Sequence, residues 1–213
     1  EWDKETILST ISSLEAEEND LVLFFYSGHG MDGTGELVVS AKEGKMDKIS
    51  PDELLTALAE IGGKKCVFLD SCYSGAFVED AGMLADGEVF GEDGSLIKEG
   101  FLFSLGPALS LSITSGRLGT DDIWLMSATT DGQLSYDSGT EGLPNQEEYG
   151  AFSYFLISSL GYDMENDSPR ISQERNEVTF LGLYRDIKRR MTESMWTEQT
   201  PQITLTPLDL VLF

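Results

Sequence analysis

Two short apolar segments interrupt the alternation of hydrophobic and polar positions along the chain. Residues 21–26 read LVLFFY and residues 66–69 read CVFL, and apolar and polar positions do not alternate within either segment. Runs of this length are typical of strands buried on both faces, as in a parallel sheet covered by helices. We therefore predict two buried strands at these positions.

Apolar residues recur at helical spacing ahead of each predicted strand. Ile7, Leu8, Ile11 and Leu14 form one stripe, and Leu54, Leu55, Leu58 and Ile61 form another. The second helix has a clear start, with Ser50 as N-cap, Pro51 at the first position and Glu53 completing a capping box. A strand, a helix and a second strand in this order form a right-handed crossover, so the two strands should be parallel.

The rest of the chain adds further elements to the same sheet. We predict a buried strand at 123–127, helices at 150–160 and over the stripe from Phe180 to Met191, and a final edge strand at 201–205 flanked by prolines. Residues 36–40 read as one strand of a surface hairpin, and residues 41–48 as a polar, mobile segment. Residues 79–122 and 137–149 read as loop insertions. The prediction is one α/β domain spanning residues 1–213, with a mostly parallel central sheet and helices on both faces.

Charge narrows the classes of partner. The chain has 213 residues, 14 basic and 38 acidic, with a net charge of −24. This balance argues against nucleic-acid binding, which needs clustered Lys and Arg. Basic substrates or cations are the natural partners of such a field, whereas a surface that only keeps the chain in solution is the alternative explanation of most of these charges. Since no apolar run approaches the length of a bilayer span, we predict no membrane span. Two cysteines make no disulfide framework, so the sequence does not assign a compartment.

Candidate chemistry follows both buried strands. Cys72 lies just after the second strand, where the N-terminus of a following helix would favour its thiolate. His29, the only histidine, follows the first strand within Ser-Gly-His-Gly. Parallel strands bring their carboxyl ends to one edge of a sheet, so the two residues should be neighbours. Cys66 lies within its strand and is read as a packing residue.

These two segments resemble a known family. FFYSGHG and VFLDSCYSG resemble the His and Cys blocks of caspase-like cysteine peptidases, and the Asp-Ser-Cys wording resembles the metacaspase side of that group. The blocks occur in the family's order, 43 positions apart. WLMSATTDGQLSYD and GAFSYFLISSLG resemble the family's next strand with its substrate-lining loop and the following helix. The resemblance implies a three-layer caspase-like sandwich, of which the first strands are a missing or separate N-terminal segment.

The resemblance also implies roles for individual residues. His29 would be the base and Cys72 the nucleophile of an endopeptidase, with the backbone N–H groups of Gly30 and Cys72 holding the oxyanion. Asp70, Ser27 and Ser127 would line the substrate site, and the acidic Asp70 implies cleavage after Arg or Lys of a peptide or protein. Asp70 has an alternative role, as a helix cap or as an acceptor for a neighbouring backbone N–H. No residue that orients His29 is identified.

Regulation is a further expectation from the family. Lys98 and Arg117 lie in the first loop insertion and are candidate sites of self-processing. The chemistry needs no cofactor, but calcium is a candidate activator, because carboxylates gather in residues 79–93 and 131–148. No loop there has the spacing of an EF-hand.

Two other functions compete with the peptidase. One is a catalytically inactive caspase-like domain that serves as a binding module. The other is a different hydrolase with a cysteine on a strand-turn-helix elbow, of the dienelactone-hydrolase kind. That arrangement needs a histidine after the nucleophile, and the only histidine precedes it.

Overall fold

The structure is a computed structural model, and it describes the chain in segments. The described residues are 2–42, 45–72, 74, 122–130, 133–136, 149–164, 166, 168–169, 177–194, 199–203 and 210–212. The helices are α1 (Lys4–Ser12), α2 (Pro51–Ala59), α5 (Ala151–Ser159) and α6 (Phe180–Glu193). The strands are β1 (Leu21–Ser27), β2 (Leu37–Lys42), β3 (Lys45–Ile49), β4 (Lys64–Asp70), β5 (Ile123–Ser127), β6 (Tyr162–Asp163), β7 (Ser168–Pro169) and β8 (Gln202–Ile203).

A four-stranded sheet with the order β1-β4-β5-β8 forms the centre of the described structure. β4 pairs in parallel with both β1 and β5, whereas β8 runs antiparallel to β5 at the edge. The predicted parallel pairing of the two apolar strands is therefore confirmed. β2 pairs with β3, and β6 with β7, in two small antiparallel sheets.

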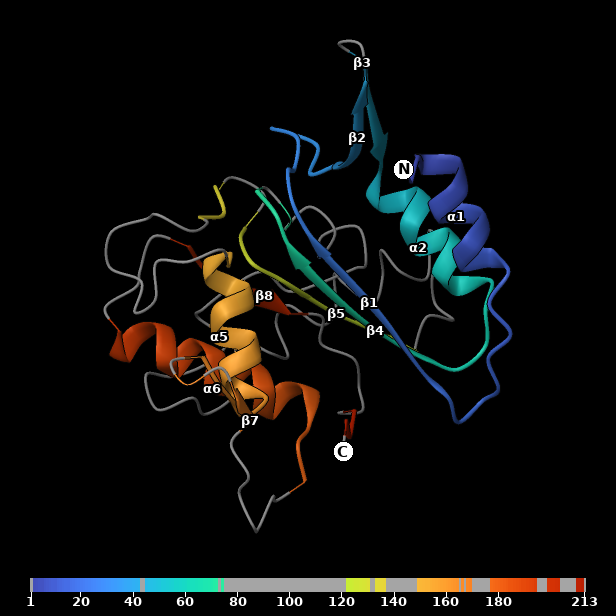
Figure 1. The fold of residues 1–213 in the computed structure, drawn as a ribbon. Coiled ribbons are helices and arrows are strands. Elements are labelled where there is room, and N and C mark those ends of the chain that lie inside the picture. The colour runs from blue at the N-terminus through green and yellow to red at the C-terminus, as the bar shows by residue number, and fades with distance from the viewer. Residues whose placement is uncertain are drawn as a thin grey trace, which may run out of the picture.

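Helices cover both faces of the central sheet (Figure 1). On one face, Cys66, Phe68, Trp124 and Met126 of the sheet share a core cluster with α5 and α6. On the other face, Val67, Leu69, Ile123 and Leu125 share a cluster with α1, α2 and the β2–β3 hairpin. The predicted three-layer α/β sandwich is confirmed by this arrangement.

Side-chain caps explain where the helices begin. The Ser50 hydroxyl accepts from the Glu53 N–H at 3.3 Å, and the Glu53 carboxylate accepts from the Ser50 N–H at 2.9 Å. Asp3 and Thr179 cap α1 and α6 in the same way, each accepting an N–H from the first turn. Each cap satisfies a donor that has no partner within the helix.

The prediction that both apolar strands are buried on both faces is correct for β4 and wrong for β1. From Lys65 to Asp70 every residue of β4 is buried, but burial alternates along β1. Leu21, Leu23 and Phe25 are 45%, 62% and 44% exposed. The reason is position: β4 lies between two strands, whereas β1 lies at the edge of the described sheet, where α5 and α6 do not reach (Figure 1).

The prediction of a polar, mobile segment at residues 41–48 is also wrong. β2 continues to residue 42, and β3 returns antiparallel to it. Leu37 and Ile49 are register partners, and both are fully buried. Lys48 also pairs with Glu36 at 2.7 Å, so one buried apolar pair and one ion pair hold a hairpin of otherwise polar composition.

Some predictions fall outside the described residues. These are nearly the whole of the loop insertions at 79–122 and 137–149, and any helix directly after Cys72. The assignment of residues 1–213 to a single domain stays a prediction. Among the described helices, none is both long and apolar enough to cross a membrane.

Candidate active site

The register of β1 and β4 brings the two candidate catalytic turns together. Ser27 and Asp70, the last residues of the two strands, are register partners, and the Gly28 N–H donates to the Asp70 carbonyl at 3.1 Å. His29 and Cys72 each follow two residues later, at the same edge of the sheet. His29 is exposed and Cys72 is half-buried. The predicted side-by-side placement of the two turns is what this register produces.

Gly30 lies directly against the main chain of Cys72. A Cβ atom on Gly30 would be 1.9 Å from the Cys72 carbonyl oxygen and 3.4 Å from the Cys72 nitrogen. Only glycine permits this approach, so the His-Gly pair has a steric reason beyond turn formation. The proposed oxyanion role of the Gly30 and Cys72 N–H groups stays a prediction.

Tyr26 supports the loop that carries His29. Its hydroxyl lies 2.9 Å from the His29 carbonyl and 2.8 Å from the Val38 carbonyl, and it can donate a hydrogen bond to either one. The Val38 N–H also donates to the His29 carbonyl at 2.9 Å. Burial raises the pKa of Tyr26 to about 12, so the hydroxyl stays protonated and remains a donor. This contact orients the main chain of His29, and the sequence analysis did not identify it.

Thr129 fixes the turn that carries Cys72. Its hydroxyl donates to the Ser71 carbonyl at 3.2 Å and accepts from the Ser74 N–H at 3.1 Å. Thr129 follows β5, so these bonds join the turn of Cys72 to the exit of the neighbouring strand. All three residues are fully buried.

The Cys72 sulfur lies beside the main chain of Ser135. The Ser135 N–H points at Sγ with N and S 3.4 Å apart, and the Ser135 carbonyl oxygen is 3.7 Å from Sγ. A thiol can donate to the carbonyl, and a thiolate can accept from the N–H. The main chain of Ser135 therefore offers a partner to either protonation state of the sulfur.

Asp70 is buried and bound by several donors. The Ser135 hydroxyl donates to Oδ1 at 2.6 Å, while the Ser153 hydroxyl and N–H donate to Oδ2 at 2.6 and 2.9 Å. Ser153 is in the first turn of α5, whose N-cap Gly150 makes no side-chain cap bond. Asp70 therefore supplies the cap from another element, and the predicted alternative, that it accepts a backbone N–H, is confirmed. A Cβ on Gly150 would lie 2.1 Å from Oδ2, which explains the glycine there.

The other predicted site residues differ in accessibility. Ser27 is exposed, and it is the register partner of Asp70 on the adjacent strand. Ser127 is fully buried and its hydroxyl donates to the Thr129 carbonyl at 3.1 Å. Lys98 and Arg117 lie outside the described residues, as do all the carboxylates considered for calcium.

The second cysteine has the features of a packing residue. Cys66 is fully buried in the core cluster below α5 and α6. Burial raises the pKa of its thiol to about 12, so the reactive thiolate is absent near neutral pH. The reading of Cys66 as structural is consistent with both observations.

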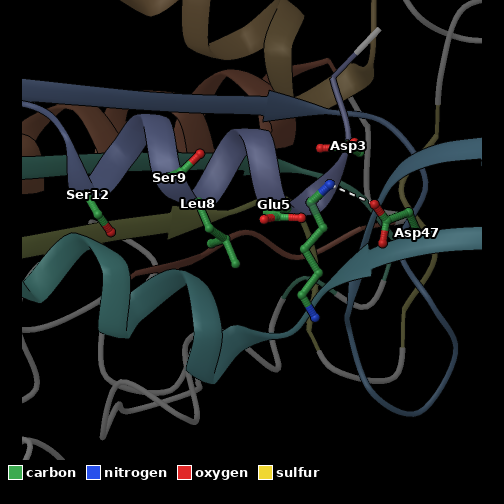
Figure 2. A pocket seen from close by; sticks show the side chains of 7 residues that line it. Asp3, Glu5, Leu8, Ser9, Ser12 and Asp47 are labelled. Atoms are coloured by element: carbon green, nitrogen blue, oxygen red, sulfur yellow. Dashed lines mark hydrogen bonds between the residues drawn. The ribbon is translucent and has the colours of Figure 1, made fainter.

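The described part of this edge contains no cluster of metal-binding side chains. Within the described residues, no three His, Cys, Asp or Glu side chains converge as a metal site. A pocket of about 530 Å³ lies elsewhere, between α1 and the β2–β3 hairpin (Figure 2). Its lining residues are Asp3, Lys4, Glu5, Leu8, Ser9, Ser12 and Asp47. It includes none of the candidate catalytic residues.

Several residues that build this site were not identified from the sequence. Ser135 and Ser153 lie in segments that resemble the family, but no local pattern indicates that both bind Asp70. Gln199, whose side chain accepts the Tyr136 N–H at 3.1 Å, lies 63 residues from its partner and carries no motif signal.

Comparison with known proteins identifies the family. The family model described as "Caspase domain" matches residues 2–212. Caspase-1 from Spodoptera frugiperda has a similar structure, with a TM-score of 0.53 and 18% identity over 99% of this chain and 72% of that chain. A protein from Geobacter sulfurreducens gives a TM-score of 0.48 and 19% identity over 98% of this chain and 74% of that one.

The structural likeness to the insect caspase shows the fold alone. The search of curated proteins found no match. The family model is the stronger finding, because it covers nearly the whole sequence, including both candidate catalytic turns. The chain therefore belongs to the caspase-domain family of cysteine peptidases.

Proposed function

We propose that the chain is a cysteine endopeptidase that acts through Cys72 and His29. The observation that supports this most directly is the parallel register. Ser27 is the partner of Asp70, and His29 and Cys72 each follow two residues later in the sequence. The close approach of Gly30 to the Cys72 main chain supports it further, because it joins the two turns directly.

His29 accepts the proton of Cys72, and the thiolate attacks the carbonyl carbon of the scissile peptide bond. The C–N bond then breaks, the leaving amine takes the proton from His29, and water hydrolyses the acyl-enzyme. The N–H groups of Gly30 and Cys72 stabilise the oxyanion. The loss of one such donor typically costs about 3 kcal/mol of transition-state stabilisation.

Specificity for Arg or Lys is the second part of the proposal. Asp70 ends β4 two residues before Cys72, and Ser135 contacts both, with its hydroxyl at Asp70 Oδ1 and its N–H at the Cys72 sulfur. The exposed Ser27 beside it supports an approach from solvent. A guanidinium or ammonium group that enters here meets a carboxylate already held in place by Ser135 and Ser153. The acidic surface attracts such substrates as well.

A panel of fluorogenic peptides tests both parts. Peptides ending in Arg, Lys, Asp or Asn are compared on the wild type, Cys72→Ala and His29→Ala. We expect cleavage of the Arg and Lys peptides by the wild type only. Cleavage after Asp or Asn would contradict the specificity, and cleavage by Cys72→Ala would contradict the mechanism. Failure of the wild type on every peptide would favour the binding module.

Self-processing and calcium activation are proposals about regulation. Cleavage after Lys98 or Arg117 is tested by mass spectrometry of active enzyme, with Cys72→Ala as the uncut control. Intact chains in active wild-type enzyme would refute it. Calcium activation is tested in the peptide assay by adding calcium or a chelator, and equal rates in both would refute that proposal.

A further strand-forming segment beside β1 is the last part of the proposal. β1 exposes Leu21, Leu23 and Phe25 on one face. Strands of parallel sheets are otherwise buried on both faces. A segment of the same polypeptide or of a separate chain that adds a strand beside β1, with an element packed over this face, would cover these side chains and complete the substrate site from that edge.

A further inference from the structure

Gln199 joins two segments that lie next to the nucleophile. Its side chain is 3% exposed. Oε1 accepts from the Tyr136 N–H at 3.1 Å, and Nε2 donates to the Ala128 carbonyl at 3.3 Å. The amide group thus bridges the exit of β5 and the segment of residues 133–136, using both its donor and its acceptor.

The segment that Gln199 holds is the one that contacts the sulfur. Tyr136 directly follows Ser135, whose N–H and carbonyl lie 3.4 and 3.7 Å from Cys72 Sγ. The Tyr136 carbonyl accepts from the Ala151 N–H at 2.8 Å. The beginning of the segment is held by Gln133, whose Oε1 accepts from the Thr200 N–H at 3.0 Å. Ser135 therefore lies between two residues whose positions are fixed by hydrogen bonds. Gln199 binds Tyr136, which is adjacent to Ser135, whereas Gln133 is two residues away from it.

We propose that Gln199 is a positioning residue that holds the main chain of Ser135 against the Cys72 sulfur. The proposal rests on the proposed function, in which Cys72 is the nucleophile. Loss of the amide would remove the hydrogen bonds that Gln199 makes with the Tyr136 N–H and the Ala128 carbonyl, and the segment of residues 133–136 would shift. The Ser135 N–H would then no longer be held toward the sulfur, and the thiolate would lose a hydrogen-bond donor.

The consequence is a change in thiol chemistry that general loosening of the fold does not produce. Iodoacetamide reacts with the thiolate, so the ratio of the Cys72 alkylation rate at low pH to that at high pH reports how well the thiolate is stabilised. Gln199→Met keeps the length and burial of the side chain but removes both hydrogen bonds. Gln202→Met is the matched control, because Gln202 is 2% exposed and its amide donates to the Thr200 carbonyl instead.

The experiment measures Cys72 alkylation by mass spectrometry at about pH 6 and about pH 9. We expect Gln199→Met to lower the rate ratio at least about fivefold, and Gln202→Met to leave it within about twofold of the wild type. With an Arg peptide, kcat of Gln199→Met should fall at least about tenfold while KM changes little, since the reacting atoms are misplaced and the binding carboxylate is retained. Gln199→Asn, one methylene shorter, cannot span both partners and serves if the Met variant does not fold.

Two outcomes would overturn the inference. One is an unchanged alkylation ratio in a folded Gln199 variant, and the other is an equal decrease in Gln202→Met. Because alkylation needs no substrate, the ratio is measured even if the wild type cleaves no peptide. A wild type that cleaves no peptide would reject the proposed peptidase activity. The alkylation ratio would still decide whether Gln199 positions Ser135.

Discussion

Asp70 has two physical roles that a single carboxylate can combine. It caps α5 through the Ser153 N–H, and it holds the hydroxyl groups of Ser135 and Ser153. Asp70 is only 3% exposed, so the basic group of a substrate would have to bind its carboxylate alongside the donors from Ser135 and Ser153. The cap is observed and the recognition of Arg or Lys is proposed, so a substitution that separates charge from hydrogen bonding distinguishes the two.

Asp70→Asn and Asp70→Ala should therefore differ in stability but not in selectivity. Asn keeps an acceptor for the Ser153 N–H, whereas Ala leaves buried donors unpaired and should cost about 1–3 kcal/mol of unfolding free energy. Both remove the charge and should abolish the preference for Arg and Lys peptides. Urea unfolding and the peptide panel measure the two effects, and Ser153→Ala is the control with the charge retained. A full preference for Arg in Asp70→Asn would refute the specificity role.

A half-buried tyrosine and a buried cysteine should make the fold sensitive to alkaline pH. Burial raises the pKa of both Tyr26 and Cys66 to about 12. In the unfolded chain these groups ionise at lower pH, so the stability they contribute is complete below the unfolded values, near 10 and 8.5. That stability is lost as pH rises toward the folded values. Urea midpoints should thus fall between about pH 9 and 12, and less steeply in Tyr26→Phe. An equally steep fall in that variant would contradict the role of Tyr26.

At the level of elements, the apolar runs and caps predicted what local sequence determines. β5 has the predicted bounds, the capping box forms, and β1 and β4 are parallel. The hairpin was underestimated because its stability comes from the buried Leu37–Ile49 pair, which a polar composition conceals. The exposure of β1 was missed for a related reason. An apolar run indicates a strand, but which strand lies at the edge depends on the whole sheet.

The exposed face of β1 leads to a prediction at this scale. Leu23→Glu should change the unfolding free energy of this chain by less than about 0.5 kcal/mol, because the side chain is already in water. Leu125→Ala, at a fully buried position of β5, should cost about 2–5 kcal/mol. Denaturant unfolding of the two variants provides the comparison. A large cost for Leu23→Glu would mean that this face is already covered, and would remove the argument for a pairing segment.

At the level of the whole molecule, the dominant property is a net charge of −24. Like charges at this density repel one another in the compact state. Raising the salt concentration from about 0.01 to 0.1 M shortens the screening length from about 30 to 10 Å. The urea midpoint should therefore rise with sodium chloride at constant pH. A midpoint that is flat or falls over this range would show that the charges are already compensated.

The candidate site was predictable where it depends on strand ends and not where it depends on distant partners. His29 and Cys72 follow recognisable strands, and Asp70 follows from the alternation of side chains on one of them. Ser135, Ser153 and Gln199 reach the site through contacts 63 to 83 residues apart in sequence. Such contacts depend on how helices and loops pack on the sheet, which no local pattern encodes.

The central claim is that His29 and Cys72 act as one catalytic unit, and a double-mutant cycle tests it most directly. The measurement is kcat/KM for an Arg peptide with the wild type, His29→Ala, Cys72→Ala and the double variant. Residues that act as a unit are strongly non-additive, so each single substitution should reduce the rate to background and the second should add nothing. Wild-type rates in His29→Ala, or activity that survives Cys72→Ala, would contradict the account.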